Sequence, residues 1–384
     1  MIELAKPELG RVKVQVVGIG NAGGTIVKRV ARERLAGVEV AAINTALKDL
    51  GNVAEIRQLQ IGTELTRGHG AGMDPKVGRK AALEDANRIR DFIGSNELVF
   101  LVAGMGKGTG TGATPVVGEL AREQGALVIA FVTTPFDHEK RCHHDIAEEG
   151  LKEIQGKVDV YVPLPNQRLY SLPSLVTYEQ ACAFMDEVIL QAIRAIVDVL
   201  LRGGRMSLDL ADLRTLFKGA GLAAFSTGYG KGEGRVAGVI RGLSEYPFAQ
   251  GGQFERARNV LVSISGGPDL GLKEVDELST AIGNLHAGEP QTATGIYQDE
   301  SLQGELRAMV LAAGVVPAEE PQDEYELFAG REAAARTGAT PYRPAGWAGR
   351  TGRPAPEREA APVDEDNIEV PAYLRKPRNG VAKG

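Results

Sequence analysis

One short segment constrains the fold of this chain more than any other part of its sequence. Residues 103–112, AGMGKGTGTG, place a glycine at every second position, directly after the apolar run 98–103 and before a helical pattern with Pro115 in its first turn. Alternating glycines and threonines at a helix start present backbone N–H groups to phosphate oxygens. The segment is not a Walker A loop, because Lys107 is followed by glycine. It predicts a strand, a phosphate-binding loop and a helix, in that order.

A second glycine-rich loop lies near the N-terminus. Residues 18–23, GIGNAG, match the G-x-G-x-x-G fingerprint between an apolar run and a helical pattern. Taken alone, the fingerprint is compatible with a dinucleotide site, a site for another nucleotide, or a tight turn. A dinucleotide site needs a carboxylate at the end of the second strand, where residues 43–46 read INTA instead. Two such loops on neighbouring parallel strands favour one nucleoside di- or triphosphate at the C-terminal edge of a sheet.

The remaining pattern is typical of a parallel sheet. In the first 165 residues, near-continuous apolar runs alternate with helical patterns, as strands buried on both faces should, and we expect strands at 12–17, 38–43, 98–103, 127–133 and 158–162. Residues 179–202 are apolar on more than one face and predict a buried connecting helix. A second unit follows, with strands expected at 220–228, 259–265, 292–298 and 306–313.

From residue 318 onward the composition changes. Prolines cluster there, and large aliphatic side chains almost vanish between Gly330 and Pro362, so this stretch cannot bury enough apolar surface to order its backbone. We expect a disordered linker at 318–363. The sequence then continues with DEDNIEVPAYLRKPR, 364–378, a short apolar patch between acidic and basic residues.

Composition argues against several classes of function. The net charge of −6 and the aromatic content of 5% argue against nucleic acid as a partner. The cysteines Cys142 and Cys182 form no C-x-x-C pair, which argues against a disulfide framework or a cysteine-based zinc site. No signal-peptide pattern opens the sequence, and no apolar run approaches the roughly 18 residues that span a bilayer. We therefore expect a soluble, cytoplasmic protein without a membrane span.

The signature at 103–112 resembles that of the tubulin/FtsZ family of GTPases, and the likeness covers about residues 11–316 and the terminal peptide. Further stretches carry it: RGHGAGMDPKVGR (67–79), TPFDHEKR (134–141), AEEGL (147–151), PNQRL (165–169), LDLADLRT (208–215) and SISGGPDL (263–270). The resemblance implies an α/β fold with a parallel-sheet GTPase domain, a long central helix, a second smaller α/β domain and a disordered C-terminal tail. The implied segments are a flexible N-terminus at 1–10, a GTP-binding domain at 11–178, the helix at 179–202, a C-terminal α/β domain at 203–317, the linker at 318–363 and a docking peptide at 364–384.

The resemblance also implies a GTP site. Its phosphate-binding positions fall on Asn21, Ala22, Gly23, Gly24 and Thr25, on Ala71 and Gly72 in a loop that senses the γ-phosphate, and on Gly104, Gly106, Gly108, Thr109 and Gly110. The ribose-side positions fall on Glu139 and His143, and the positions that hydrogen-bond the guanine edge fall on Asn166 and Asp186. GTP and GDP are the implied ligands, with Mg²⁺ bound mainly through their phosphates and with no metal-binding residue of the protein.

Several positions depart from the family pattern. Lys107 replaces a glycine, and it either reaches the phosphates or points to solvent. His143 replaces an arginine, with Arg141 as the alternative contact. Cys182 stands where an aromatic residue stacks on the base, with Phe184 two residues further on. Guanine is still the expected base, bound by its edge.

A histidine cluster offers a different interpretation of the same region. His138, His143 and His144 lie close together in the sequence. Their spacing suits no common zinc pattern, and no acidic triad surrounds them. We therefore expect no metal ion there.

Two carboxylates are the expected catalytic groups. Asp209 and Asp212 stand three residues apart at a predicted helix start, which by itself indicates an N-cap and an acidic first turn. The resemblance implies instead that this loop lies at the bottom of one subunit and completes the active site on the GTP of the next. Ser207 replaces an asparagine of the family's loop, and a shorter side chain there predicts slower hydrolysis.

The resemblance therefore implies a GTPase that polymerises with itself, head to tail, into filaments for bacterial cell division at the mid-cell ring. Residues 366–376 are expected to dock on membrane-tethering and regulatory division proteins. Two alternatives stay open. One is a paralogue that binds GTP and assembles but hydrolyses poorly, and the remote one is an NAD-dependent oxidoreductase, favoured only by the first glycine fingerprint.

Overall fold

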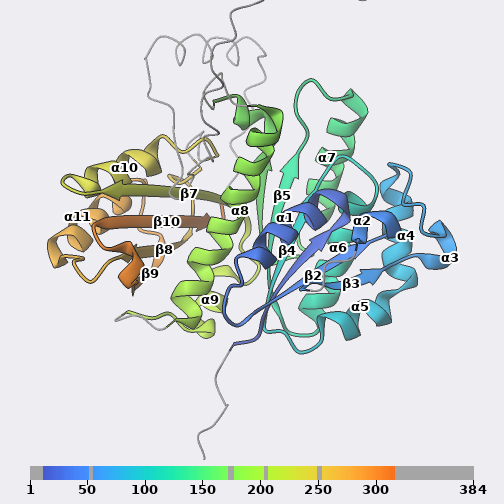
Figure 1. Ribbon diagram of the computed structural model, residues 1–384, viewed down its shortest axis with the longest axis horizontal. Coiled ribbons are helices and arrows are strands. Elements are labelled where there is room, and N and C mark those ends of the chain that lie inside the picture. The colour runs from blue at the N-terminus through green and yellow to red at the C-terminus, as the bar shows by residue number, and fades with distance from the viewer. Residues whose placement is uncertain (1–11, 52–54, 172–176, 203–205, 249–252, 316–384) are drawn as a thin grey trace, which may run out of the picture. The chain divides into compact units, whose positions relative to one another are not determined.

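The computed structural model describes residues 12–51, 55–171, 177–202, 206–248 and 253–315 (Figure 1). The predicted N-terminal segment 1–10, the linker 318–363 and the docking peptide 364–384 lie outside the described residues. Among the helices of the described part, none combines the length and the apolar character that a membrane crossing needs.

The first half of the chain forms a parallel sheet, as predicted. Its strands run in the order β3-β2-β1-β4-β5-β6, and every neighbouring pair is parallel. The strands are β1 (Val14–Ile19), β2 (Val38–Asn44), β3 (Arg57–Gln60), β4 (Leu98–Gly104), β5 (Leu127–Thr134) and β6 (Val160–Pro165). The chain continues from β1 outward to β2 on one side and later returns to β4 on the other. The order therefore reverses between β1 and β4, where open α/β sheets bind ligands.

Helices cover both faces of this sheet, because alternate side chains of the strands point to opposite faces. Val16, Phe100 and Phe131 pack in one buried cluster with α1 (Gly20–Arg32) and α8 (Tyr178–Leu201). The other face is covered by α4, α5, α6 and α7. The bounds of these four helices are Pro75–Glu84, Ala86–Ile93, Thr109–Glu123 and Arg141–Ile154. Two one-turn helices, α2 (Leu47–Leu50) and α3 (Thr63–Thr66), lie in the loops between β2 and α4.

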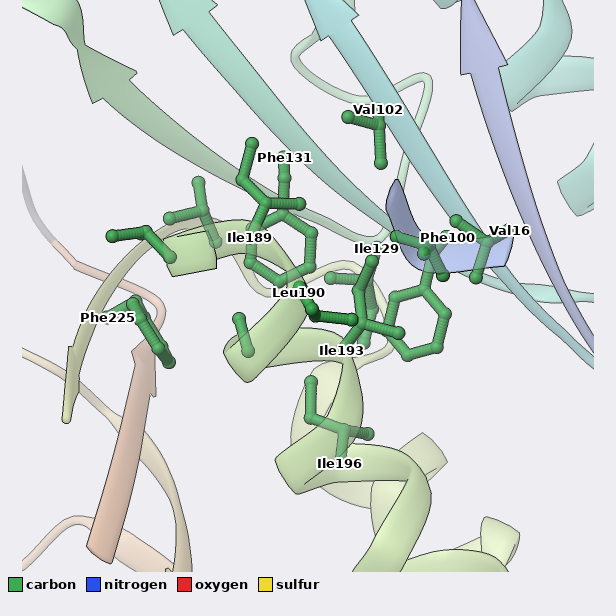
Figure 2. Packing of buried hydrophobic residues seen from close by; sticks show 14 of the residues in the cluster. Val16, Phe100, Val102, Ile129, Phe131, Ile189, Leu190, Ile193, Ile196 and Phe225 are labelled. Carbon is green, nitrogen blue, oxygen red and sulfur yellow. The ribbon is translucent and has the colours of Figure 1, made fainter. Parts of the chain in front are cut away.

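The long helix α8 joins the two halves of the chain. It begins one residue before the predicted start, where Thr177 caps it by accepting a hydrogen bond of 3.2 Å from the backbone of Gln180. Figure 2 shows its apolar side chains Ile189, Leu190, Ile193 and Ile196 among residues of β1, β4 and β5 and beside Phe225 of the second half. The prediction of a buried connecting helix is confirmed.

The second half is mainly antiparallel. Its strands follow the order β7-β10-β8-β9, with β7–β10 and β10–β8 antiparallel and β8–β9 parallel. The elements are α9 (Leu210–Phe217), β7 (Gly221–Lys231), α10 (Arg235–Ser244), β8 (Asn259–Gly266), α11 (Leu272–Gly283), β9 (Gln291–Gln298), η2 (Glu300–Leu302) and β10 (Glu305–Ala313). Among the described residues, this sheet joins the first where Val160 and Tyr161 of β6 pair with β7.

Candidate functional site

Two glycine-rich loops meet at the point where the strand order reverses. Helix α1 begins directly after β1, and α6 begins a few residues after β4. A Cβ atom on Gly20 would lie 3.0 Å from the backbone N of Gly110, and one on Gly104 would lie 2.8 Å from the Cβ atom of Ala22. Neither helix has an acidic residue in its first turn. The positive ends of two helix dipoles therefore converge on one place, which suits a polyphosphate.

A third loop closes the other side of the signature loop. A Cβ atom on Gly108 would lie 2.7 Å from the Cβ atom of Ala71, and one on Gly78 would lie 2.4 Å from the carbonyl oxygen of Gly108. Gly72 has φ +59°, with open space where a Cβ would stand. The structure thus brings together the three segments to which the family resemblance assigns phosphate binding: residues 21–25, 71–72 and 104–110.

Thr45 was missed by the sequence reasoning. It is buried directly after β2, and its hydroxyl oxygen lies 2.7 Å from that of Thr109. The contact ties the end of a neighbouring strand to the start of α6. A signal did exist, because Thr45 lies at the end of the second strand, the region in which a dinucleotide fold carries its carboxylate.

Glu139 lies in the loop between β5 and α7 and is held by two contacts. One carboxylate oxygen accepts a hydrogen bond of 3.1 Å from the backbone N–H of Phe136, and the other lies 3.2 Å from Nδ1 of His143. Burial raises the pKa of Glu139, but these two contacts and the positive charge of Lys107 outweigh it, so the pKa lies below its ordinary value. Lys107 is exposed, yet its charge acts on the Glu139 carboxylate.

The predicted base-binding residues lie on two elements that pack together. Asn166 begins the 3₁₀ helix η1 (Asn166–Ser171) directly after β6, and Asp186 lies in the third turn of α8. Burial raises the pKa of Asp186 to about 6, with Arg29 opposing the shift and Glu187 adding to it. Glu187 itself forms an ion pair with Arg29.

Phe184 is not available to a ligand. Its side chain is 1% exposed and belongs to the core cluster beneath α8. Tyr178, one turn before Cys182, is a nearby aromatic residue that does reach the surface, and it is 69% exposed. Sequence reasoning had not assigned Tyr178 a role.

The three histidines have separate partners. His143 contacts Glu139, Nε2 of His144 lies 3.0 Å from the carbonyl oxygen of Phe136, and Nδ1 of His138 lies 3.3 Å from the hydroxyl of Tyr170. Across the residues that the structure describes, no three His, Cys, Asp or Glu side chains gather closely enough to hold a metal ion.

Asp209 and Asp212 cap α9 reciprocally. The Asp209 carboxylate accepts a hydrogen bond of 2.8 Å from the backbone of Asp212, and the Asp212 carboxylate accepts one of 3.0 Å from the backbone of Asp209. The local interpretation as an N-cap is therefore correct. Both side chains are exposed. This reciprocal pair of bonds is a capping box. Each bond uses one carboxylate oxygen, so the capping box fixes the direction in which the second oxygen of each side chain points.

Helix α9 is fastened to the edge of the parallel sheet that lies opposite the glycine loops. Arg214 donates to the carbonyl oxygens of Gly125 (2.7 Å) and Glu97 (3.3 Å), which precede β5 and β4. The buried carboxylate of Asp159 accepts from the backbone of Gly219, just after α9. Strand β4 has seven residues, which at about 3.3 Å each separate its two ends by roughly 20 Å. Figure 1 shows α9 at the lower end of α8.

Comparison with known proteins gives a consistent result. Residues 13–173 match the model of the "Tubulin/FtsZ family, GTPase domain", and residues 221–316 match the "FtsZ family, C-terminal domain". The chain is 36% identical to the cell division protein FtsZ of Coxiella burnetii over 82% of both chains. It is 37% identical to the cell division protein FtsZ 2 of Rhizobium meliloti, over 82% of this chain and 92% of that one. Among solved structures, an empty FtsZ dimer of M. jannaschii superimposes with a TM-score of 0.74 at 31% identity, covering 80% of this chain and 89% of that chain.

Proposed function

Because this chain belongs to the tubulin/FtsZ family of GTPases, we propose that it hydrolyses GTP at the junction between subunits joined head to tail. It is a cell-division GTPase of the FtsZ type, and GTP and GDP are its ligands. The NAD-dependent alternative is set aside, because the family is that of a GTPase and the second strand ends in INTA (43–46), without the carboxylate that binds ribose in dinucleotide folds.

One observation carries the proposal. The carboxylates of Asp209 and Asp212 stand at one edge of the parallel sheet, and the glycine loops stand at the other, about 20 Å away along β4. No side-chain rotation spans that distance, so these carboxylates cannot act on a nucleotide in their own subunit. Stacking a second copy head to tail would bring the α9 edge of one subunit over the glycine loops of the next. Such a contact does not close on itself and makes a filament.

The phosphates would be bound by the residues of the three converging loops: Asn21, Ala22, Gly23, Gly24, Thr25, Ala71, Gly72, Gly104, Gly106, Gly108, Thr109 and Gly110. Glu139 would bind the ribose, held by His143. Hydroxyl and backbone groups dominate this surface, a donor set that suits a Mg²⁺ ion held mainly by phosphate oxygens and water. When bound, the ion would neutralise phosphate charge.

In hydrolysis, Asp209 and Asp212 would orient the water that attacks the neighbour's γ-phosphate. The capping box supports this role, because it holds both carboxylates in a fixed geometry at the start of α9. A paralogue with slow turnover is the second candidate, and Ser207, His143 and Cys182 favour it. Both candidates predict GTP binding and assembly and differ in rate.

The test is the GTPase rate per subunit at increasing protein concentration, with sedimentation of the same samples. We expect the rate to rise steeply at the concentration where pelletable filaments appear. A rate per subunit that is independent of concentration, with substantial turnover below that threshold, would contradict hydrolysis at the junction.

Guanine binding should depend on pH through Asp186. The base donates its N–H groups to an ionised carboxylate, and burial raises the pKa of that carboxylate to about 6. GDP affinity should therefore be constant above pH 7 and fall as the pH drops below 6, by about tenfold per pH unit. Titration calorimetry from pH 5 to pH 8 measures it. Asp186→Asn is the matched control, since an amide does not titrate, and its affinity should lack this phase. An identical pH profile in both proteins would contradict the assignment.

Arg214 should matter for turnover and not for binding. Removing its guanidinium frees α9 from the carbonyl groups of Glu97 and Gly125, and a small displacement of the carboxylates should lower the GTPase rate by about tenfold. GDP affinity should be unchanged, because the nucleotide lies at the opposite edge. Thr215→Ala is the control, since the Thr215 hydroxyl donates only to Ala211 of its own helix. A weaker GDP affinity in Arg214→Ala would show that the substitution does not lower turnover by displacing α9 alone.

We also propose that residues 366–376 dock on membrane-tethering and regulatory division proteins at the mid-cell ring. The support is the sequence pattern alone, an apolar patch flanked by acidic and basic residues. These residues lie outside those that the structure describes.

A further inference from the structure

Tyr178 is an exposed aromatic residue that no other part of the structure explains. It is the first residue of α8, and its side chain is 69% exposed. Its ring nevertheless has a fixed neighbour, because the ring centroid of the buried Phe136 lies 5.9 Å away at an angle of 43° between the planes. An aromatic side chain that is packed along one side and open on the other offers a free surface to a ligand.

The position of Tyr178 relates it to the nucleotide residues on both sides. Tyr178, Cys182 and Asp186 follow one another at intervals of four residues, so they share one face of α8. Cys182, burial and the negative charge of Glu139 together raise the pKa of Tyr178. Tyr178 therefore shares a helix face with Asp186 and packs against Phe136, whose backbone N–H donates to Glu139.

A guanine base that is hydrogen-bonded at its edge also has two flat faces, and burying them against an apolar surface adds to its affinity. Asp186 and Asn166 can satisfy the polar edge of guanine, but the flat faces are apolar and gain by stacking on an aromatic ring, which contributes about 1–3 kcal/mol per base. The Cys182 side chain is small and only half-buried, so it leaves room on this face of α8. Phe136 cannot fill that room, since its side chain is 6% exposed.

We propose that the ring of Tyr178 forms the stacking surface for the guanine base beside Cys182. The inference rests on the proposed GTP site. It assigns the base contact to the residue one turn before Cys182, and it makes Tyr178 a binding residue of the site.

The experiment is titration calorimetry with GDP and with IDP, which lacks the exocyclic amino group of guanine, at pH 7.5. We expect Tyr178→Ala to weaken GDP binding by about 10- to 100-fold and to leave the GDP-to-IDP affinity ratio at its wild-type value, because stacking does not read the base edge. Tyr178→Phe retains the ring and should bind GDP within about twofold of wild type. Asp186→Ala should instead lower the GDP-to-IDP ratio.

Tyr170→Ala is the matched control. Tyr170 is also an exposed tyrosine beside Phe136, with ring centroids 6.0 Å apart, but its hydroxyl is engaged with His138. Wild-type GDP affinity in Tyr170→Ala supports the proposal. Wild-type affinity in Tyr178→Ala, or an equal loss in both alanine variants, overturns it while leaving GTP binding intact. A wild-type protein that binds no GDP would instead refute the proposed function.

Discussion

The Asp212→Ala protein should bind GTP with unchanged affinity and hydrolyse it at least about a hundredfold more slowly than the wild type. The nucleotide loops lie at the opposite edge of the sheet, so this substitution should not change nucleotide binding. The water that attacks the γ-phosphate in the neighbouring subunit's site, however, loses the group that orients it. Asp209→Ala should lower the rate less. Phosphate release above the assembly threshold and GTP titration on the same sample give the two quantities.

The capping box requires a control, because Asp212→Ala also leaves the backbone N–H of Asp209 without its partner. Losing such a cap costs about 1 kcal/mol. Asp212→Asn keeps an acceptor oxygen and removes the charge, so it should be as slow as the alanine variant but melt at the wild-type temperature. Wild-type turnover in Asp212→Asn would rule out the carboxylate as the catalytic group.

The Gly110→Ala protein should fold and yet bind GDP about a hundredfold more weakly. A Cβ atom at this position would lie 2.3 Å from the carbonyl oxygen of Gly104, so the signature loop must open where it meets α1. GDP titration measures the loss, and circular dichroism checks the fold. Gly283→Ala is the control, because a Cβ atom there meets nothing within 4 Å. An unchanged GDP affinity in Gly110→Ala would contradict the assignment of the signature loop to the nucleotide site.

These two variants together test action across the junction. Gly110→Ala retains Asp212 but binds nucleotide weakly, whereas Asp212→Ala binds nucleotide normally but lacks the carboxylate. Each should be nearly inactive alone, and an equimolar mixture should recover turnover at mixed junctions. A mixture as slow as its components, under conditions in which both proteins sediment together, would contradict a carboxylate supplied by the neighbour.

Most strands could be predicted because their cause is local. Strand β4 was expected at 98–103 and is observed at Leu98–Gly104, and β5 was expected at 127–133 and is observed at Leu127–Thr134. Both are apolar along their whole length, as burial on two faces requires. Strand β3, Arg57–Gln60, was missed. Its sequence RQLQ has a single buried apolar residue, and it lies at the edge of the sheet, where it pairs with β2 alone.

The sequence by itself determined the two glycine loops, the cap of α9 and the family, because each depends on residues that are neighbours in the chain. Only the tertiary structure decided which residues that are far apart in the chain come into contact. The parallel pairing of β1 with β4 brings the two loops into contact, and Arg214 holds α9 at the far edge of the sheet. The same applies to α8, where packing buries Phe184, leaves Tyr178 at the surface and raises the pKa of Asp186. Local sequence sets backbone conformation, but exposure and the distances between segments depend on which faces the whole chain buries.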